Sequence, residues 1–135
     1  MNWRLIFALS LFGVVMAVAG LFGLTRKIEP LLWLLIFIIY AICIAKYCAG
    51  KYFLHGFLVS LLNGVWIALI HFAFFPLFLR NNPDMAIAFQ NLPQSISLRA
   101  LNLIIGPIVG ALFGIVAGLF AWVAARLLKK NPFAA

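Results

Sequence analysis

The chain has 135 residues, of which 67% are hydrophobic and only 9% are charged. Water-soluble domains average about 45–50% apolar and about 25% charged residues, so this composition excludes an ordinary soluble domain and requires lipid to cover part of the surface. Ten Lys and Arg residues against two acids give a formal net charge of +8. Because the bases lie at the ends of apolar runs, we expect them to meet anionic lipid headgroups and exclude nucleic acid as a partner.

The first apolar run extends from Leu5 to Leu24 without a charged residue. Arg4 and the small residues Ala17 and Ala19 resemble the basic region and the cleavage site of a signal peptide. Apolar sequence continues past Ala19, however, and about 20 apolar residues suffice to cross a bilayer. We therefore expect a retained membrane span over 5–24.

The second span is expected over 31–49, after Glu29 and Pro30, which suit the first turn of a helix. Gly50 provides a stop, so the second and third spans should form a tight antiparallel hairpin. The third span is expected over 52–79. A helix of that length measures about 42 Å against a hydrocarbon core of about 30 Å. We expect it to tilt, protrude or bend, with Pro76 disturbing only its last turn.

A polar segment follows over residues 80–99. Asn82, Pro83 and Asp84 occur in the order of an N-cap, an N1 proline and an early acid. Apolar residues then recur at helical spacing, namely Met85, Ala88, Phe89 and Leu92. This pattern predicts a short amphipathic helix over 83–91 that lies in the membrane interface, with an irregular loop as the alternative.

The fourth span is expected over 101–128, before Lys129 and Lys130. Pro107 lies inside it, and we expect a kink because proline removes one backbone hydrogen bond of a helix. The predicted fold is therefore one all-α domain over 1–135. It is a bundle of four transmembrane helices with a short interfacial helix between the third and the fourth.

A row of glycines is the sharpest motif of the sequence. One occurs at every fourth position of the last span, at Gly106, Gly110, Gly114 and Gly118. Such a row forms a slanted groove without side chains, where another helix can approach closely. Gly13 and Ala17 form a looser counterpart in the first span, so we expect the row to contact either that span or a second copy of the chain. Three uses of the row fit this spacing: packing within one chain, an interface with a partner, and a glycine-lined path for a solute.

The third span carries polar residues at membrane depth. On a helical wheel, one face collects its small and polar side chains: Gly56, Ser60, Asn63, Gly64, Ala68 and His71. A buried amide needs a hydrogen-bond partner where no water is present, so Asn63 should face the bundle. This face is expected either to fix helix packing or to line a path for a solute or ion. A proton relay through His71 is disfavoured, because no acid lies within a span.

The sequence contains no constellation typical of an enzyme. His55 and His71 are about 24 Å apart along one helix and cannot share a metal ion. Cys43 and Cys48 point about 140° apart, a poor geometry for a disulfide. We therefore predict no enzymatic activity, no cofactor and no metal site.

Two known classes of small membrane protein have a similar size. Small proton-coupled drug exporters rely on an acid inside the first span, where this chain has Ser10 as its polar residue. Four-span fluoride channels have an Asn-rich, Phe-lined pore. We interpret as coincidence the faint match of Asn63 near Phe72, Phe74 and Phe75.

Three groups of residues carry a resemblance to a known family. They are Gly56-Phe57 with Gly64, the aromatic-rich segment before Asn82-Pro83-Asp84, and Gly106-Pro107 through Gly118 before the terminal lysines. In these the chain resembles a bacterial four-span family, common in Bacteroidetes, that is described as a domain of unknown function. The resemblance implies a bacterial inner membrane and brings no activity, substrate or site residue.

Two functions follow from these features. We expect a non-enzymatic helix-packing or interaction protein, acting as a homo-oligomer or as an accessory subunit of a membrane complex and in contact with membrane lipids. The alternative is a small solute or ion transporter that uses Ser60, Asn63 and His71 of the third span. A transporter needs a cavity that reaches Asn63, whereas a packing subunit has this residue buried and hydrogen-bonded.

The distribution of bases predicts the topology. Four spans place Met1 and Ala135 on the same side of the membrane. That side carries six bases, Arg4, Lys46, Lys51, Arg126, Lys129 and Lys130. The other side carries four, Arg26, Lys27, Arg80 and Arg99. The positive-inside rule therefore predicts that both termini are cytoplasmic. Reporter fusions at each end should both give the cytoplasmic signal, and signals from opposite faces would show that the span count is wrong.

Overall fold

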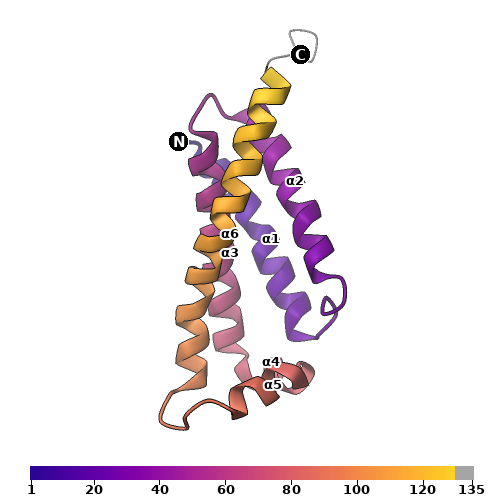
Figure 1. The fold of residues 1–135 in the computed structure, drawn as a ribbon, viewed down its shortest axis with the longest axis vertical. Helices are drawn as coiled ribbons and strands as arrows, with labels where there is room; N and C mark the ends of the chain where they lie inside the picture. Colours follow the sequence, from indigo (N-terminus) through magenta and orange to yellow (C-terminus); the bar gives the residue numbers. More distant parts are fainter. Residues whose placement is uncertain (130–135) are drawn as a thin grey trace.

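A computed structural model describes residues 1–129, and every regular element in that range is an α-helix. Four helices are long and apolar enough to cross a membrane, namely α1 (Trp3–Leu21), α2 (Glu29–Tyr47), α3 (Tyr52–Ala73) and α6 (Leu98–Lys129). Two short helices, α4 (Phe75–Asn81) and α5 (Pro83–Gln90), lie across one end of the bundle (Figure 1). The predicted all-α polytopic fold is confirmed, and the chain is a multi-pass membrane protein. Lys130 and Ala135, on which the topology prediction also rests, lie outside the described residues.

The helices do not pack in chain order. α3 contacts α6 along most of its length and also contacts α1, whereas α2 packs mainly on α6. A tight turn joins α2 to α3 at Lys51, whose φ of 53° is left-handed. The two helices nevertheless make few contacts with each other. α2 and α3 are therefore antiparallel neighbours in the chain, as expected, but they do not pack against each other. Each of them packs on α6 instead.

The third span ends earlier than predicted. α3 stops at Ala73, and its 22 residues measure about 33 Å, close to the hydrocarbon thickness of about 30 Å. The chain bends at Phe74 (φ −112°, ψ 34°), and the rest of the predicted span forms α4. Pro76 lies in the first turn of α4, where its missing N–H costs no helical hydrogen bond. The prediction of one helix over 52–79 was thus wrong, since Pro76 belongs to the start of a new helix.

The other boundaries differ from the prediction by a few residues. α1 and α2 each begin and end two or three residues before the expected 5–24 and 31–49. Asn2 explains the early start of α1, because its Oδ1 accepts a hydrogen bond from the Leu5 backbone N–H at 3.2 Å. α6 runs without a break through Pro107 and has 32 residues, about 48 Å. Its ends therefore extend beyond the hydrocarbon core.

The short helix predicted over 83–91 is present as α5 (Pro83–Gln90). Asn82 occupies its N-cap position but does not cap it. The Asn82 side chain donates instead to the carbonyl oxygens of Gly20 at 2.9 Å and Phe78 at 2.8 Å. Phe89 packs with Leu21 and Phe78 in a small core that joins α5 to the rest of the bundle.

The glycine row of α6 lies against α3. A Cβ atom added at Gly110 would lie 2.9 Å from the Ser60 carbonyl oxygen and 3.0 Å from the Gly64 Cα. One added at Gly56 would lie 2.6 Å from the Ala117 carbonyl oxygen, a distance that real Cβ atoms essentially never show. The two backbones therefore approach this closely only because side chains are missing on both helices.

Farther along α6, the row accepts aromatic rings. The Phe57 ring lies where a Gly114 side chain would be, and the Phe53 ring does the same at Gly118. The row is thus packed within the chain, against the third span. Neither of the two expected partners, the first span or a second copy, occupies it.

Gly13 and Ala17 also contact α3 rather than the glycine row. A Cβ atom at Gly13 would lie 2.8 Å from the Asn63 Cα. Ala17 is 1% exposed, and its carbonyl oxygen lies 3.2 Å from His71 Nε2. α3 is therefore held between α1 on one side and α6 on the other.

The hydrophobic core lies toward the end of the bundle that carries Met1. α2 and α6 converge there around Phe37, Tyr40 and Ile44 of α2 and Ala117 of α6. Toward the α4–α5 end, α2 diverges from α3 and α6 (Figure 1). The spans thus form a wedge that is closed at one end.

Replacing Gly110 or Gly114 with Leu should destabilise the bundle by steric exclusion. A Cβ alone already meets Ser60 at Gly110 and Phe57 at Gly114, and overpacking costs about 1–3 kcal/mol or more. Thermal unfolding followed by circular dichroism in mild detergent measures the effect. Gly50→Leu is the matched control, because no atom lies within 4 Å of its Cβ position. Unfolding temperatures equal to the parent in both row variants would contradict the packing described.

Candidate functional site

A cleft of about 640 Å³ lies between α2, α3 and α6, on the side where α2 diverges. This volume falls within the range of about 300–1,000 Å³ that is typical of ligand pockets. Its walls are mostly apolar and aromatic, with Trp33 and Phe37 from α2 and Val109 and Phe113 from α6. A few polar residues interrupt them: Arg26, Glu29, Ser60, Asn63 and Asn102.

Asn63 lies in the wall of the cleft and is 2% exposed. Its Nδ2 donates a hydrogen bond to the Tyr40 hydroxyl at 2.8 Å, which links α3 to α2. Its Oδ1 is buried and has no hydrogen-bond partner among residues 1–129. Leaving a buried acceptor unpaired costs about 1–3 kcal/mol. The prediction that Asn63 faces the bundle is confirmed, and one acceptor of its amide remains free.

Asn102 carries a second unpaired amide group. It lies one helical turn before Gly106, and its buried Nδ2 has no partner within the described part of the chain. Neither of these two atoms is exposed to the cleft, because both are buried and Asn63 Oδ1 lies against Gly13 of α1, 2.7 Å from where a Gly13 Cβ would be.

Ser60 lines the cleft, but its donor is already used. The hydroxyl donates to the Gly110 carbonyl oxygen at 3.0 Å, across the contact between α3 and α6. Ser60 therefore stabilises the close approach of the two helices and has no free hydrogen-bond donor for a bound molecule.

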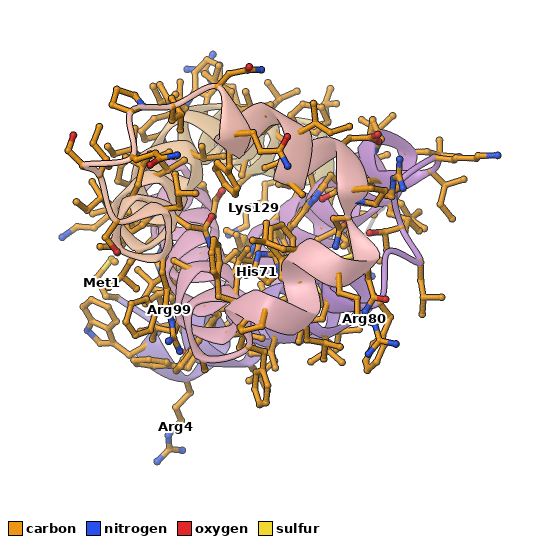
Figure 2. The ribbon with its side chains drawn as sticks, turned by 90° about the horizontal axis from the view of Figure 1, so that it is seen from below. Met1, Arg4, His71, Arg80, Arg99 and Lys129 are labelled. Carbon is orange, nitrogen blue, oxygen red and sulfur yellow. The ribbon has the colours of Figure 1, made fainter. Side chains whose placement is uncertain are left out.

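His71 does not line the cleft. Its ring stacks on Phe78 of α4 with the centroids 4.2 Å apart, and its Nε2 hydrogen-bonds the Ala17 carbonyl oxygen at 3.2 Å. Seen from the α4–α5 end, His71 lies in the middle of the bundle and Arg4 points away from it (Figure 2). The predicted lining of Ser60, Asn63 and His71 is thus brought together only in part, since His71 joins α3 to α1 and α4.

The outer end of the cleft is polar and lies beside α5. Arg26 forms a salt bridge with Asp84 of α5. Glu29 accepts a hydrogen bond from Trp33 Nε1 at 3.4 Å. Asn81 donates to the Leu21 carbonyl oxygen at 2.9 Å, which fixes α4 on the end of α1. The helices at the mouth are therefore tied together by polar contacts.

Two polar residues at or beside the cleft, Asn102 in its lining and Tyr40 bonded to Asn63, were not predicted from the sequence. Asn102 extends the glycine row by one further step of four residues toward the N-terminus, a signal that points to the same helix face. Tyr40 is a polar group in the middle of an otherwise apolar second span. Both signals could have been used, although neither of them indicates that a cleft is present.

Comparisons with protein families, with characterised proteins and with solved structures found no match to the chain. The resemblance to a bacterial four-span family therefore stays a prediction. The interpretation of the cleft rests on its own geometry.

The bond between Asn63 and Tyr40 should be measurable by a double-mutant cycle. We expect Asn63→Leu to destabilise the protein by about 0.5–2 kcal/mol. Its coupling to Tyr40→Phe should be about 0.6 kcal/mol, with about 1.7 kcal/mol as the upper end for interhelical bonds. Unfolding of the parent, both single variants and the double variant in detergent gives the coupling. Asn91→Leu, at an exposed position of the segment after α5, serves as the uncoupled control. Additive effects of the first pair would contradict the bond.

Proposed function

We propose that the protein binds a small amphiphilic molecule inside the membrane, in the cleft between α2, α3 and α6. The observation that carries the proposal is a cleft of about 640 Å³ with apolar inner walls and with the polar residues Arg26, Glu29 and Asn102 in its lining. Apolar walls accept a hydrocarbon chain or ring. The polar residues of the lining can hydrogen-bond the polar group of the ligand.

The lining favours an amphiphile over an ion. An ion needs a ring of carbonyl oxygens or charged side chains in place of its hydration shell. Here the charged residues Arg26 and Glu29 occur only at the outer end, and Arg26 is paired with Asp84. The inner walls, formed by residues such as Phe37, Val109 and Phe113, supply no such ring.

The shape of the cleft favours a carrier or binding protein over a continuous pore. α2 and α6 close the bundle around Phe37, Tyr40 and Ala117, on the side of Met1. The cleft is lined by the half of α2 that begins at Glu29, on the side where α2 diverges from α3 and α6. A ligand would therefore enter from the membrane or from the α4–α5 end.

We further propose that the protein lies in a bacterial inner membrane with both termini in the cytoplasm. The base count supports this orientation, and the cleft then opens toward the extracytoplasmic half of the bilayer. An interaction role stays a second prediction. The glycine row at Gly106–Gly118 no longer argues for it, because α3 of the same chain fills the row.

A photoreactive long-chain alcohol, with a diazirine in its chain, tests the proposed binding. The reconstituted protein should be labelled saturably, and peptide mass spectrometry should place the label on cleft residues of α2 and α6. Val109→Trp should abolish the saturable labelling, because the larger ring fills the cleft that Val109 lines.

Leu112→Trp is the matched control. It makes the same kind of change on the same helix, but Leu112 is 62% exposed on the outer surface and does not line the cleft. It should therefore leave the labelling intact. Labelling that never saturates, or that survives Val109→Trp unchanged, would reject the cleft as the binding site.

A further inference from the structure

A second pocket lies at the other end of the bundle, far from the mouth of the cleft. It has a volume of about 380 Å³ and is lined by Tyr52, Trp122, Ala125, Arg126 and Lys129. None of these residues borders the cleft between α2, α3 and α6. The pocket is therefore independent of the binding proposed above.

Two cations of α6 border this pocket, and aromatic rings hold both of them in place. The Arg126 guanidinium lies 3.9 Å from the centre of the Trp122 ring. Lys129 Nζ donates to the Tyr52 hydroxyl at 2.5 Å and to the Cys48 carbonyl oxygen at 2.9 Å. At a spacing of three residues, the two cations share one face of the helix.

Among residues 1–129, no acidic side chain pairs with these two cations. The two acidic side chains of the sequence belong to Glu29 and Asp84, and both lie at the opposite end of the bundle. Further bases lie on the same side as the pocket, at Arg4, Lys46 and Lys51. Arg126 and Lys129 lie in the last turn of α6, where cations offset the partial negative charge of the helix end.

The pocket continues onto an apolar, outward-facing surface of α6. Leu119 is 50% exposed, Val123 45% and Leu127 68%, with Trp122 between them. Trp and Tyr side chains favour the depth at which phospholipid headgroups meet the hydrocarbon. A molecule with an anionic head and an apolar tail fits this combination of charge and surface.

We infer that this pocket binds the headgroup phosphate of an anionic phospholipid, with an acyl chain along the outer face of α6. Arg126 presents a planar guanidinium suited to a phosphate, and Lys129 adds a second positive charge. The rings of Trp122 and Tyr52 fix the cations before a lipid arrives, so less side-chain freedom is lost on binding.

Quenching of Trp122 fluorescence by brominated lipids tests this inference. Trp3, Trp33 and Trp66 are replaced by Phe, and the full chain is reconstituted in phosphatidylcholine vesicles. These vesicles contain equal fractions of either phosphatidylglycerol or phosphatidylcholine brominated near the headgroup. We expect the brominated phosphatidylglycerol to bind about fivefold or more tightly than the brominated phosphatidylcholine, and so to quench Trp122 more strongly. Each base near an anionic surface raises the affinity by about that factor.

Arg126→Gln with Lys129→Gln should remove the preference. Arg4→Gln with Lys46→Gln removes the same charge from the same end and should leave it. Native mass spectrometry of the otherwise unchanged chain, with each lipid, gives a second readout that needs no Trp replacement.

Three results would overturn the site. They are equal quenching by the two lipids, an equal loss of preference in both double variants, and release of the brominated lipid by inorganic phosphate. The last result would assign the pocket to a soluble phosphate instead.

Discussion

The close approach of α3 and α6 is the contact on which the rest of the bundle depends. In a bilayer, the lipid tails are as apolar as the helix surfaces, so helices associate through tight packing and hydrogen bonds rather than by hydrophobic burial. Gly64 and Gly110 bring the two backbones together, and the Ser60 hydroxyl bonds the Gly110 carbonyl oxygen at the same place. α1 then packs on the other side of α3, with Gly13 fitting against Asn63.

The same contact explains why a cleft exists. α2 packs mainly on α6 and makes few contacts with α3, so it is held where it converges on α6 near Tyr40 and Ala117. Beyond that point, α2 leaves the pair and the cleft opens. Asn63 crosses the gap to Tyr40, and this bond sets the register of α2 at the back of the cleft. The helix face of α3 that packs on α6 thus also borders the cleft proposed to bind a ligand.

Hydropathy and helical periodicity sufficed to predict the four spans, the short α5 helix and the inward face of α3. They failed where several helices compete for one surface. A glycine at every fourth position shows that the residues on this face of α6 are small. It does not show which helix packs there, and from the sequence we did not consider α3 as that helix. The break at Phe74 was missed because Pro76 fits both the end of one helix and the start of another. The cleft itself could not be predicted, since it arises from the divergence of helices, and His71 shares a wheel face with Asn63 yet lies outside it.

Oxidative crosslinking of a cysteine beside the glycine row tests the central contact most directly. Ala117→Cys is introduced after Cys43 and Cys48 are replaced by Ser, because Ala117 is 0% exposed and its backbone lies against Gly56 of α3. Tagged and untagged copies are then mixed in the membrane and oxidised. The account predicts no covalent dimer, and protection of this thiol from a maleimide until the protein is unfolded, because α3 of the same chain covers it. Covalent dimers that carry one tagged and one untagged chain would show that the row joins two copies and would contradict the account.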